Sequence, residues 1–88
     1  MTLQFRFRLD EAAQKSGVAP EQILIFVTRT WIKPVDPVLQ VFDEEDVARI
    51  QLIHELQESM GVNDDAVPVI MHLIDQLNRL HLELSSRS

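Results

Sequence analysis

The sequence predicts a small, mainly α-helical fold in a single domain. Four segments carry apolar residues at helical spacing, and glycine or proline separates most of them. Only two short stretches have the character of β-strands. With 88 residues the chain has room for one small domain, and its hydrophobic content of 45% is typical of a folded protein.

The N-terminal part predicts a short half-buried strand followed by two short helices. The strand prediction depends on the alternation of four apolar residues with polar ones: Leu3, Phe5, Phe7 and Leu9. We expect Asp10 to cap a helix that ends near Ser16, where Gly17 supplies the left-handed conformation common at helix ends. Pro20 suits the first position of a second helix, which should run to about Thr30. Its buried face should hold Ile23, Phe26 and Val27. Two short helices joined by a glycine turn predict a helix-turn-helix.

A short β wing is expected next, because Pro34 and Pro37 exclude a helix. The predicted wing is a pair of strands within residues 31–42, with a turn around residues 35–37. Its apolar residues are Val38, Leu39, Val41 and Phe42.

The third predicted helix begins after Asp43 and is opened by four acids, residues 43–46, which suit the positive end of a helix. Gly61 should end this helix. Its expected buried stripe comprises Val47, Ile50, Ile53, Leu56 and Met60.

The last predicted helix is capped by residues 63–65 and has Pro68 in its first turn. Its leucine-rich seam has heptad spacing over two repeats and comprises Ile70, Leu73, Leu77, Leu80 and Leu84. A helix that runs about 17 residues past Pro68 is hard for so small a fold to cover alone, so we expect the seam to form a homodimer. Packing onto the third helix and gripping a different protein remain alternatives. The predicted organisation is therefore a winged helix-turn-helix over residues 1–62 and a coiled-coil helix over residues 63–88.

The residue types needed for most catalytic and metal sites are missing. There is no cysteine and no tyrosine, and two glycines cannot build a phosphate-binding loop. The histidines, His54, His72 and His81, do not have the spacing of metal ligands. We therefore expect no catalytic residue, no metal site, no cofactor and no enzymatic activity. The longest apolar run is too short to span a membrane, and the lack of cysteine fits a cytoplasmic protein.

The charge is distributed unevenly along the chain. Residues 1–42 have a net charge of +1 and residues 43–88 a net charge of −7. Nucleic-acid binding is not favoured by this pattern, because phosphates attract basic surfaces. An acidic half instead favours a partner with a basic surface. The candidate partner-binding residues are Asp43, Glu44, Glu45, Glu55, Glu58, Asp64 and Asp65. For residues 43–46, a helix cap with a solvated face is the simpler interpretation, and both roles are compatible.

The order of predicted elements resembles the MerR-type winged helix-turn-helix. The resemblance lies in the first-helix motif at residues 9–13 (LDEAA), the turn glycine at residue 17, the entry to the wing at residues 30–34 (TWIKP) and the helix start at residues 41–47 (VFDEEDV). It covers most of the chain and implies the fold.

The DNA-contacting motifs of that family are absent. MerR-type regulators carry Arg-Tyr-Tyr in the second helix, where this chain has Leu24, Ile25 and Phe26. They also carry an arginine two residues before the wing's closing tyrosine, where this chain has Gln40 before Phe42. Arginines of this kind hold phosphates and position the motif on a duplex. An apolar second helix suits a protein surface better.

This degraded pattern resembles the CbpM family of chaperone modulators, including the acidic entry to the third helix and a last helix like residues 69–77 (VIMHLIDQL). The resemblance implies a partner, the J-domain of a CbpA-like, DnaJ-related co-chaperone. Members of that family bind the J-domain, block its work with the DnaK chaperone and reduce DNA binding by the co-chaperone. An acidic modulator would compete for the basic helix that a J-domain offers to Hsp70.

Two alternatives remain open at this point. One is a transcriptional regulator that has kept DNA binding through Arg6, Arg8, Arg29 and Lys33. The other is that a protein partner is contacted by the apolar helix at residues 23–27 instead of by the acidic residues. The direction of regulation is also left open by the sequence.

Overall fold

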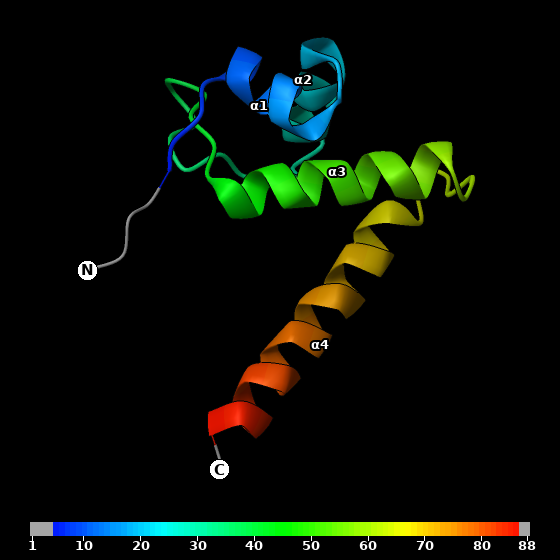
Figure 1. Ribbon diagram of the computed structural model, residues 1–88. Helices are drawn as coiled ribbons and strands as arrows, with labels where there is room; N and C mark the ends of the chain where they lie inside the picture. The colour runs from blue at the N-terminus through cyan, green and yellow to red at the C-terminus, as the bar shows by residue number, and fades with distance from the viewer. Residues whose placement is uncertain (1–4, 87–88) are drawn as a thin grey trace.

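The described part of the chain, residues 5–86 of a computed structural model, is mainly helical, as predicted. It contains α1 (Leu9–Ser16), α2 (Pro20–Thr28), α3 (Glu44–Glu58) and α4 (Val67–Ser86). Helices α1 and α2 pack together on one side of α3, and α4 leaves the far end of α3 at a steep angle (Figure 1).

The ends of α1 show one wrong and one confirmed prediction. The helix begins at Leu9 with Arg8 as its N-cap, so Asp10 lies in the first turn and does not cap it. The backbone N–H of Arg8 donates to the Glu11 carboxylate at 3.0 Å, which fixes the start two residues earlier than predicted. At the other end Gly17 has a φ of 74° and donates its N–H to the Ala13 carbonyl, as expected for a glycine cap.

The predicted N-terminal strand is a single antiparallel bridge within the described residues. Phe7 and Phe42 exchange both backbone hydrogen bonds at 2.7 Å, and both side chains are buried. The ladder cannot continue, because the Arg8 N–H is taken by Glu11 and Leu9 is already helical. Leu3, the first residue of the prediction, lies outside the described residues.

The wing is also reduced to one bridge, between Asp36 and Val41, and its turn spans residues 37–40 rather than residues 35–37. The Asp36 carboxylate accepts the N–H groups of Val38 and Leu39 at 3.1 and 3.0 Å. Since these donors bind a side chain, they are lost to a β ladder. The prediction of a two-stranded wing was therefore too regular.

Helix α2 begins at Pro20, as predicted, but ends at Thr28, two residues earlier than expected. Thr30 has a φ of 62°, which is incompatible with continuing the helix. Ile23 and Phe26 are completely buried, and Val27 is half-buried at the edge of the core.

Helix α3 is capped by Asp43, as predicted. The Asp43 carboxylate accepts the Asp46 N–H at 2.8 Å, and the Asp46 carboxylate accepts the Asp43 N–H at 3.1 Å, a reciprocal capping box. The predicted stripe is buried at Val47, Ile50, Ile53 and Leu56. Met60 was wrongly included: it is 67% exposed, because the helix ends at Glu58 and the following turn moves Met60 out of the stripe.

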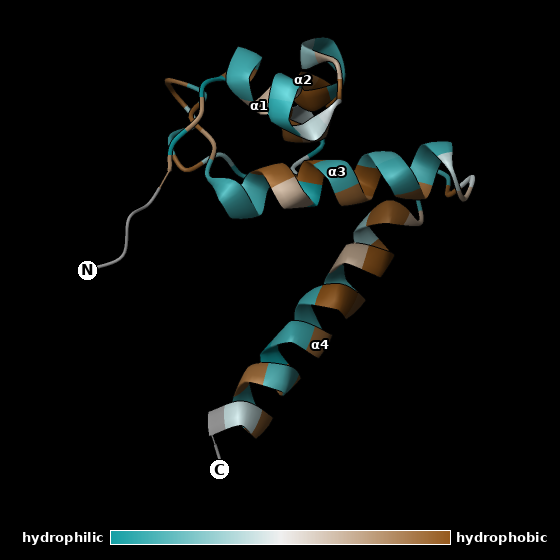
Figure 2. Cartoon of the chain, viewed as in Figure 1, coloured by the Kyte–Doolittle hydropathy of each residue, from teal (hydrophilic) through white to brown (hydrophobic). Residues whose placement is uncertain are grey.

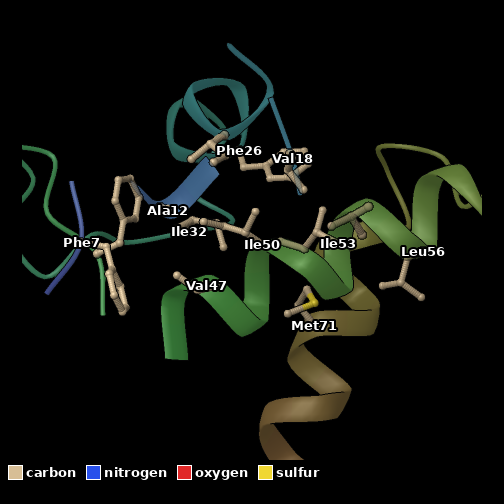
Figure 3. Packing of buried hydrophobic residues seen from close by; sticks show 13 residues of the cluster. Phe7, Ala12, Val18, Phe26, Ile32, Val47, Ile50, Ile53, Leu56 and Met71 are labelled. Atoms are coloured by element: carbon tan, nitrogen blue, oxygen red, sulfur yellow. The ribbon is translucent and has the colours of Figure 1, made fainter. Parts of the chain in front are cut away.

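The core lies around α3. Ile50 and Ile53 point toward Val18 and Phe26 from the helix-turn-helix, while Met71 of α4 approaches α3 from the other side (Figure 3). Val67 is completely buried and Met71 is 3% exposed, so the first turns of α4 belong to this core.

The remainder of α4 projects from the body. Every residue from 76 to 85 is exposed. The radius of gyration is 14.0 Å, whereas a compact chain of this length would have about 12 Å. Helix α4 thus has a packed base and a free arm, which is visible in Figure 1.

Candidate functional site

The first group of predicted partner-binding acids lies at the start of α3. Glu44 and Glu45 are exposed, while Asp43 is partly buried and committed to the helix cap. The neighbouring Asp46 is partly buried as well, and this burial raises the pKa of its carboxyl group. Two of the four acids are therefore structural, and Glu44 and Glu45 are the members open to a partner.

The second group lies at the other end of α3. Glu55 and Glu58 are exposed on the last turn of the helix, and Asp64 and Asp65 are exposed on the connection to α4. A helix of 15 residues is about 22 Å long. The structure thus divides the predicted acidic surface into two groups at opposite ends of α3.

Asp64 is engaged within the chain. Its carboxylate accepts a hydrogen bond from Gln57 at 2.7 Å and forms an ion pair with Arg29 at 2.8 Å. Both charged side chains are about half exposed, so solvent screens the pair strongly. Arg29 also lies over the Trp31 ring, 5.3 Å from its centroid. Arg29, the cation that follows α2, therefore binds the connection between α3 and α4 of the same chain.

The second helix of the helix-turn-helix carries no basic residue. Helix α2 has the sequence PEQILIFVT, with Glu21 in its first turn. Of the three apolar residues, Ile25 is 43% exposed, Leu24 is partly exposed, and Phe26 is buried in the core. The predicted apolar surface on this helix is thus smaller than the sequence suggests.

The corner between α3 and α4 holds a link that the sequence did not predict. Arg49 donates to both carboxylate oxygens of Asp75, at 2.9 and 3.0 Å, and its Nε donates to the Trp31 carbonyl at 3.1 Å. The paired guanidinium lowers the pKa of Asp75, and His72 and Arg79 act in the same direction. This bidentate pair joins α3, α4 and the segment after α2, and so fixes where the arm points.

A polar crevice of about 310 Å³ lies beside this link. It is lined by Thr30, Trp31, Lys33, Glu45, Asp46, Arg49 and Asp75. Its three acids outnumber its two cations by one, so the crevice has little net charge with which to select a ligand.

The predicted dimerisation seam lies mainly on the free arm of α4. Leu73, Leu77, Leu80 and Leu84 are between 51% and 64% exposed, and Ile70 is partly buried at the base. The core contact of α4 is made by a neighbouring face, Val67, Met71 and Ile74. Hydrophobic residues recur along the whole helix (Figure 2). Packing of the leucines onto α3, one of the alternatives, does not occur in the single chain.

Within residues 5–86 no group of three potential ligands is arranged to hold a metal ion. No described helix has both the length and the apolar character needed to cross a membrane.

A comparison with models of known protein families identifies the family of this chain. The model of the family described as "MerR HTH family regulatory protein" matches residues 7–73, which include the helix-turn-helix, the wing, α3 and the packed base of α4. No curated protein matches the chain.

Proposed function

Because the chain belongs to the MerR HTH family, we propose that it is a protein-binding member that inhibits a CbpA/DnaJ-like co-chaperone by binding its J-domain and blocking access to DnaK. Proteins of the MerR family are in general regulators without enzymatic activity. The proposal concerns what this regulator binds.

The observation that carries the proposal is the absence of cations from α2. In a helix-turn-helix the second helix enters the major groove, and nearby basic side chains hold the phosphates. Here α2 offers Glu21 and a partly exposed Ile25. Arg29, the nearest cation, is already paired with Asp64. This surface is poorly suited to a phosphate backbone and better suited to a protein.

The charge of the second half supports a basic partner. Glu44, Glu45, Glu55 and Glu58 are exposed along α3 and are acidic groups that a positively charged helix would meet favourably. On a helical wheel Glu44, Glu55 and Glu58 fall on one face, opposite the buried stripe. The acidic groups at the two ends of α3 could therefore contact one elongated partner helix.

We further propose that the protein acts as a homodimer joined through the leucines of the α4 arm. An isolated helix that exposes a leucine seam is poorly stable in water, and a second copy would cover the seam in heptad register. The Arg49–Asp75 link would set the direction in which the arm presents this seam.

Isothermal titration calorimetry with a purified CbpA-type J-domain tests the main proposal. We expect saturable binding at about 50 mM salt that weakens clearly at about 500 mM salt, because exposed charges are screened. Absence of binding at low salt would contradict the proposal, and binding insensitive to salt would remove its electrostatic part.

A pair of charge-reversal variants locates the surface. Glu55→Lys with Glu58→Lys should weaken J-domain binding, whereas Asp10→Lys with Glu21→Lys changes the net charge equally on α1 and α2 and should have little effect. Circular dichroism melts would establish that both variants fold. The reverse result would move the interface to α2.

DNA binding is the second candidate function, and the family match favours it as much as the first. Arg8 and Lys33 are exposed cations on the helix-turn-helix side of the chain. Fluorescence anisotropy with duplex fragments distinguishes the two functions, since tight and sequence-selective binding would favour a transcriptional regulator.

A further inference from the structure

The most exposed large hydrophobic side chain of the described chain lies at the tip of the wing. Val38 is 88% exposed and its neighbour Leu39 is 70% exposed. Both lie in the turn at residues 37–40, outside the hydrophobic core. Turn tips usually carry glycine, asparagine, aspartate or serine. An apolar pair at this position therefore serves no need of the fold.

The turn is held in a fixed shape. Asp36 and Val41 close it with two backbone hydrogen bonds, at 3.2 and 3.0 Å. Within the turn the Asp36 carboxylate accepts the N–H groups of both Val38 and Leu39. The apolar projection is therefore preorganised, and binding would cost the turn little conformational entropy.

The segment that holds the wing and the start of α3 is acidic in sequence. Between residues 33 and 46 Lys33 is the only basic residue, whereas Asp36, Asp43, Glu44, Glu45 and Asp46 are acidic. The four acids at the start of α3, residues 43–46, repel a nucleic-acid backbone. The complement of this segment is a protein surface with an apolar pocket that is edged by lysine or arginine side chains.

We propose that the wing tip, Val38 and Leu39, inserts into such a basic-edged apolar pocket on the protein partner, while Glu44 and Glu45 meet its basic edge. This inference rests on the proposed function and adds a contact that the acidic residues alone do not supply. Two adjacent aliphatic side chains buried in a pocket would add affinity through the apolar surface that they remove from water.

Calorimetry with a CbpA-type J-domain as the probe tests the inference. We expect Val38→Ser with Leu39→Ser to weaken binding about tenfold to hundredfold through lost apolar burial, with an unchanged melting temperature because both residues are exposed. Leu82→Ser is the matched control: Leu82 is 69% exposed on the arm of α4 and belongs neither to the seam nor to the acidic groups, so binding should be unaffected. Val38→Ile with Leu39→Met keeps the tip apolar and should retain wild-type affinity.

The outcomes separate the two proposals. If the wild-type protein does not bind the J-domain, the proposed function and the inference both fail. If the wild type binds and the double serine variant binds equally well, only the wing-tip inference is overturned. If the double serine variant instead changes affinity for duplex DNA, the wing contacts nucleic acid and the inference is again overturned.

Discussion

The link between Arg49 and Asp75 should contribute measurably to the stability of the fold, because it is a bidentate pair that bridges α3 and α4. The two side chains are 32% and 46% exposed, so solvent screens their attraction. Exposed ion pairs contribute about 0.2–1 kcal/mol, and bidentate geometry places a pair at the upper end of that range. We expect a coupling free energy of about 0.5–1 kcal/mol between Arg49 and Asp75.

A double-mutant cycle with Arg49→Met and Asp75→Asn measures this coupling. Arginine and methionine have similar helix propensities, as have aspartate and asparagine, so the substitutions change the link more than the helices. In a domain of this size, 1 kcal/mol shifts Tm by about 4–8 °C. Thermal unfolding should be followed at one protein concentration, since the Tm of a dimer depends on concentration. A coupling free energy of zero would refute the assigned role of the pair.

The pH dependence of the same cycle gives a second readout. Arg49 lowers the pKa of Asp75 in the folded state, so the carboxylate contributes stability above its unfolded pKa. This contribution is lost as the pH falls through the lowered folded pKa, that is, below the ordinary aspartate value of 3.8. The difference in stability between wild type and Asp75→Asn should therefore be full at neutral pH and shrink in acid. A difference that stays constant into strong acid would contradict this sign.

Three further predictions follow from the caps and the arm. Asp43→Ala should lower the free energy of unfolding by about 1 kcal/mol in chemical denaturation, whereas Asp43→Asn should retain most of it; equal loss in both would contradict the capping role. Gly17→Ala should lower the free energy of unfolding by about 1 kcal/mol. The cause is the positive φ alone, because an added Cβ would meet nothing within 4 Å. An unchanged denaturation midpoint would argue against the left-handed cap. Leu77→Asp with Leu80→Asp should convert a dimer to a monomer in sedimentation equilibrium without loss of α1–α3 helicity; an unchanged mass would exclude the seam as the dimer contact.

Local signals in the sequence located most of the fold. Gly17, Pro20 and Asp43 each act through their own backbone or the next turn, so their effects can be inferred from neighbouring residues. The buried stripe of α3 was found by the same logic up to Leu56. Met60 was assigned wrongly because periodicity alone does not show where a helix stops.

The strands were harder to predict, because local side chains compete with the β ladder for hydrogen bonds. Glu11 takes the Arg8 N–H, and Asp36 takes two donors of the wing turn. Both outcomes depend on side-chain geometry rather than on the alternation of apolar residues. The exposed pair Val38 and Leu39, expected as part of a strand, is the consequence.

The candidate site could be predicted only in part. The acids and leucines were found by charge and spacing, but their division into groups depends on the length of α3 and on how α4 leaves the body. The two ion pairs join residues that are far apart in the sequence. Arg49 and Asp75 are 26 residues apart, and Arg29 and Asp64 lie on separate elements. Contacts of this range have no local signal in a single sequence.

The proposed function requires that the helix-turn-helix of this protein does not bind DNA. Amide chemical-shift mapping of the labelled protein during a titration with duplex DNA tests it most directly. We predict no saturable shift changes in residues 20–33 at physiological salt. Saturable, sequence-dependent changes in that segment would contradict the claim and identify a DNA-binding regulator.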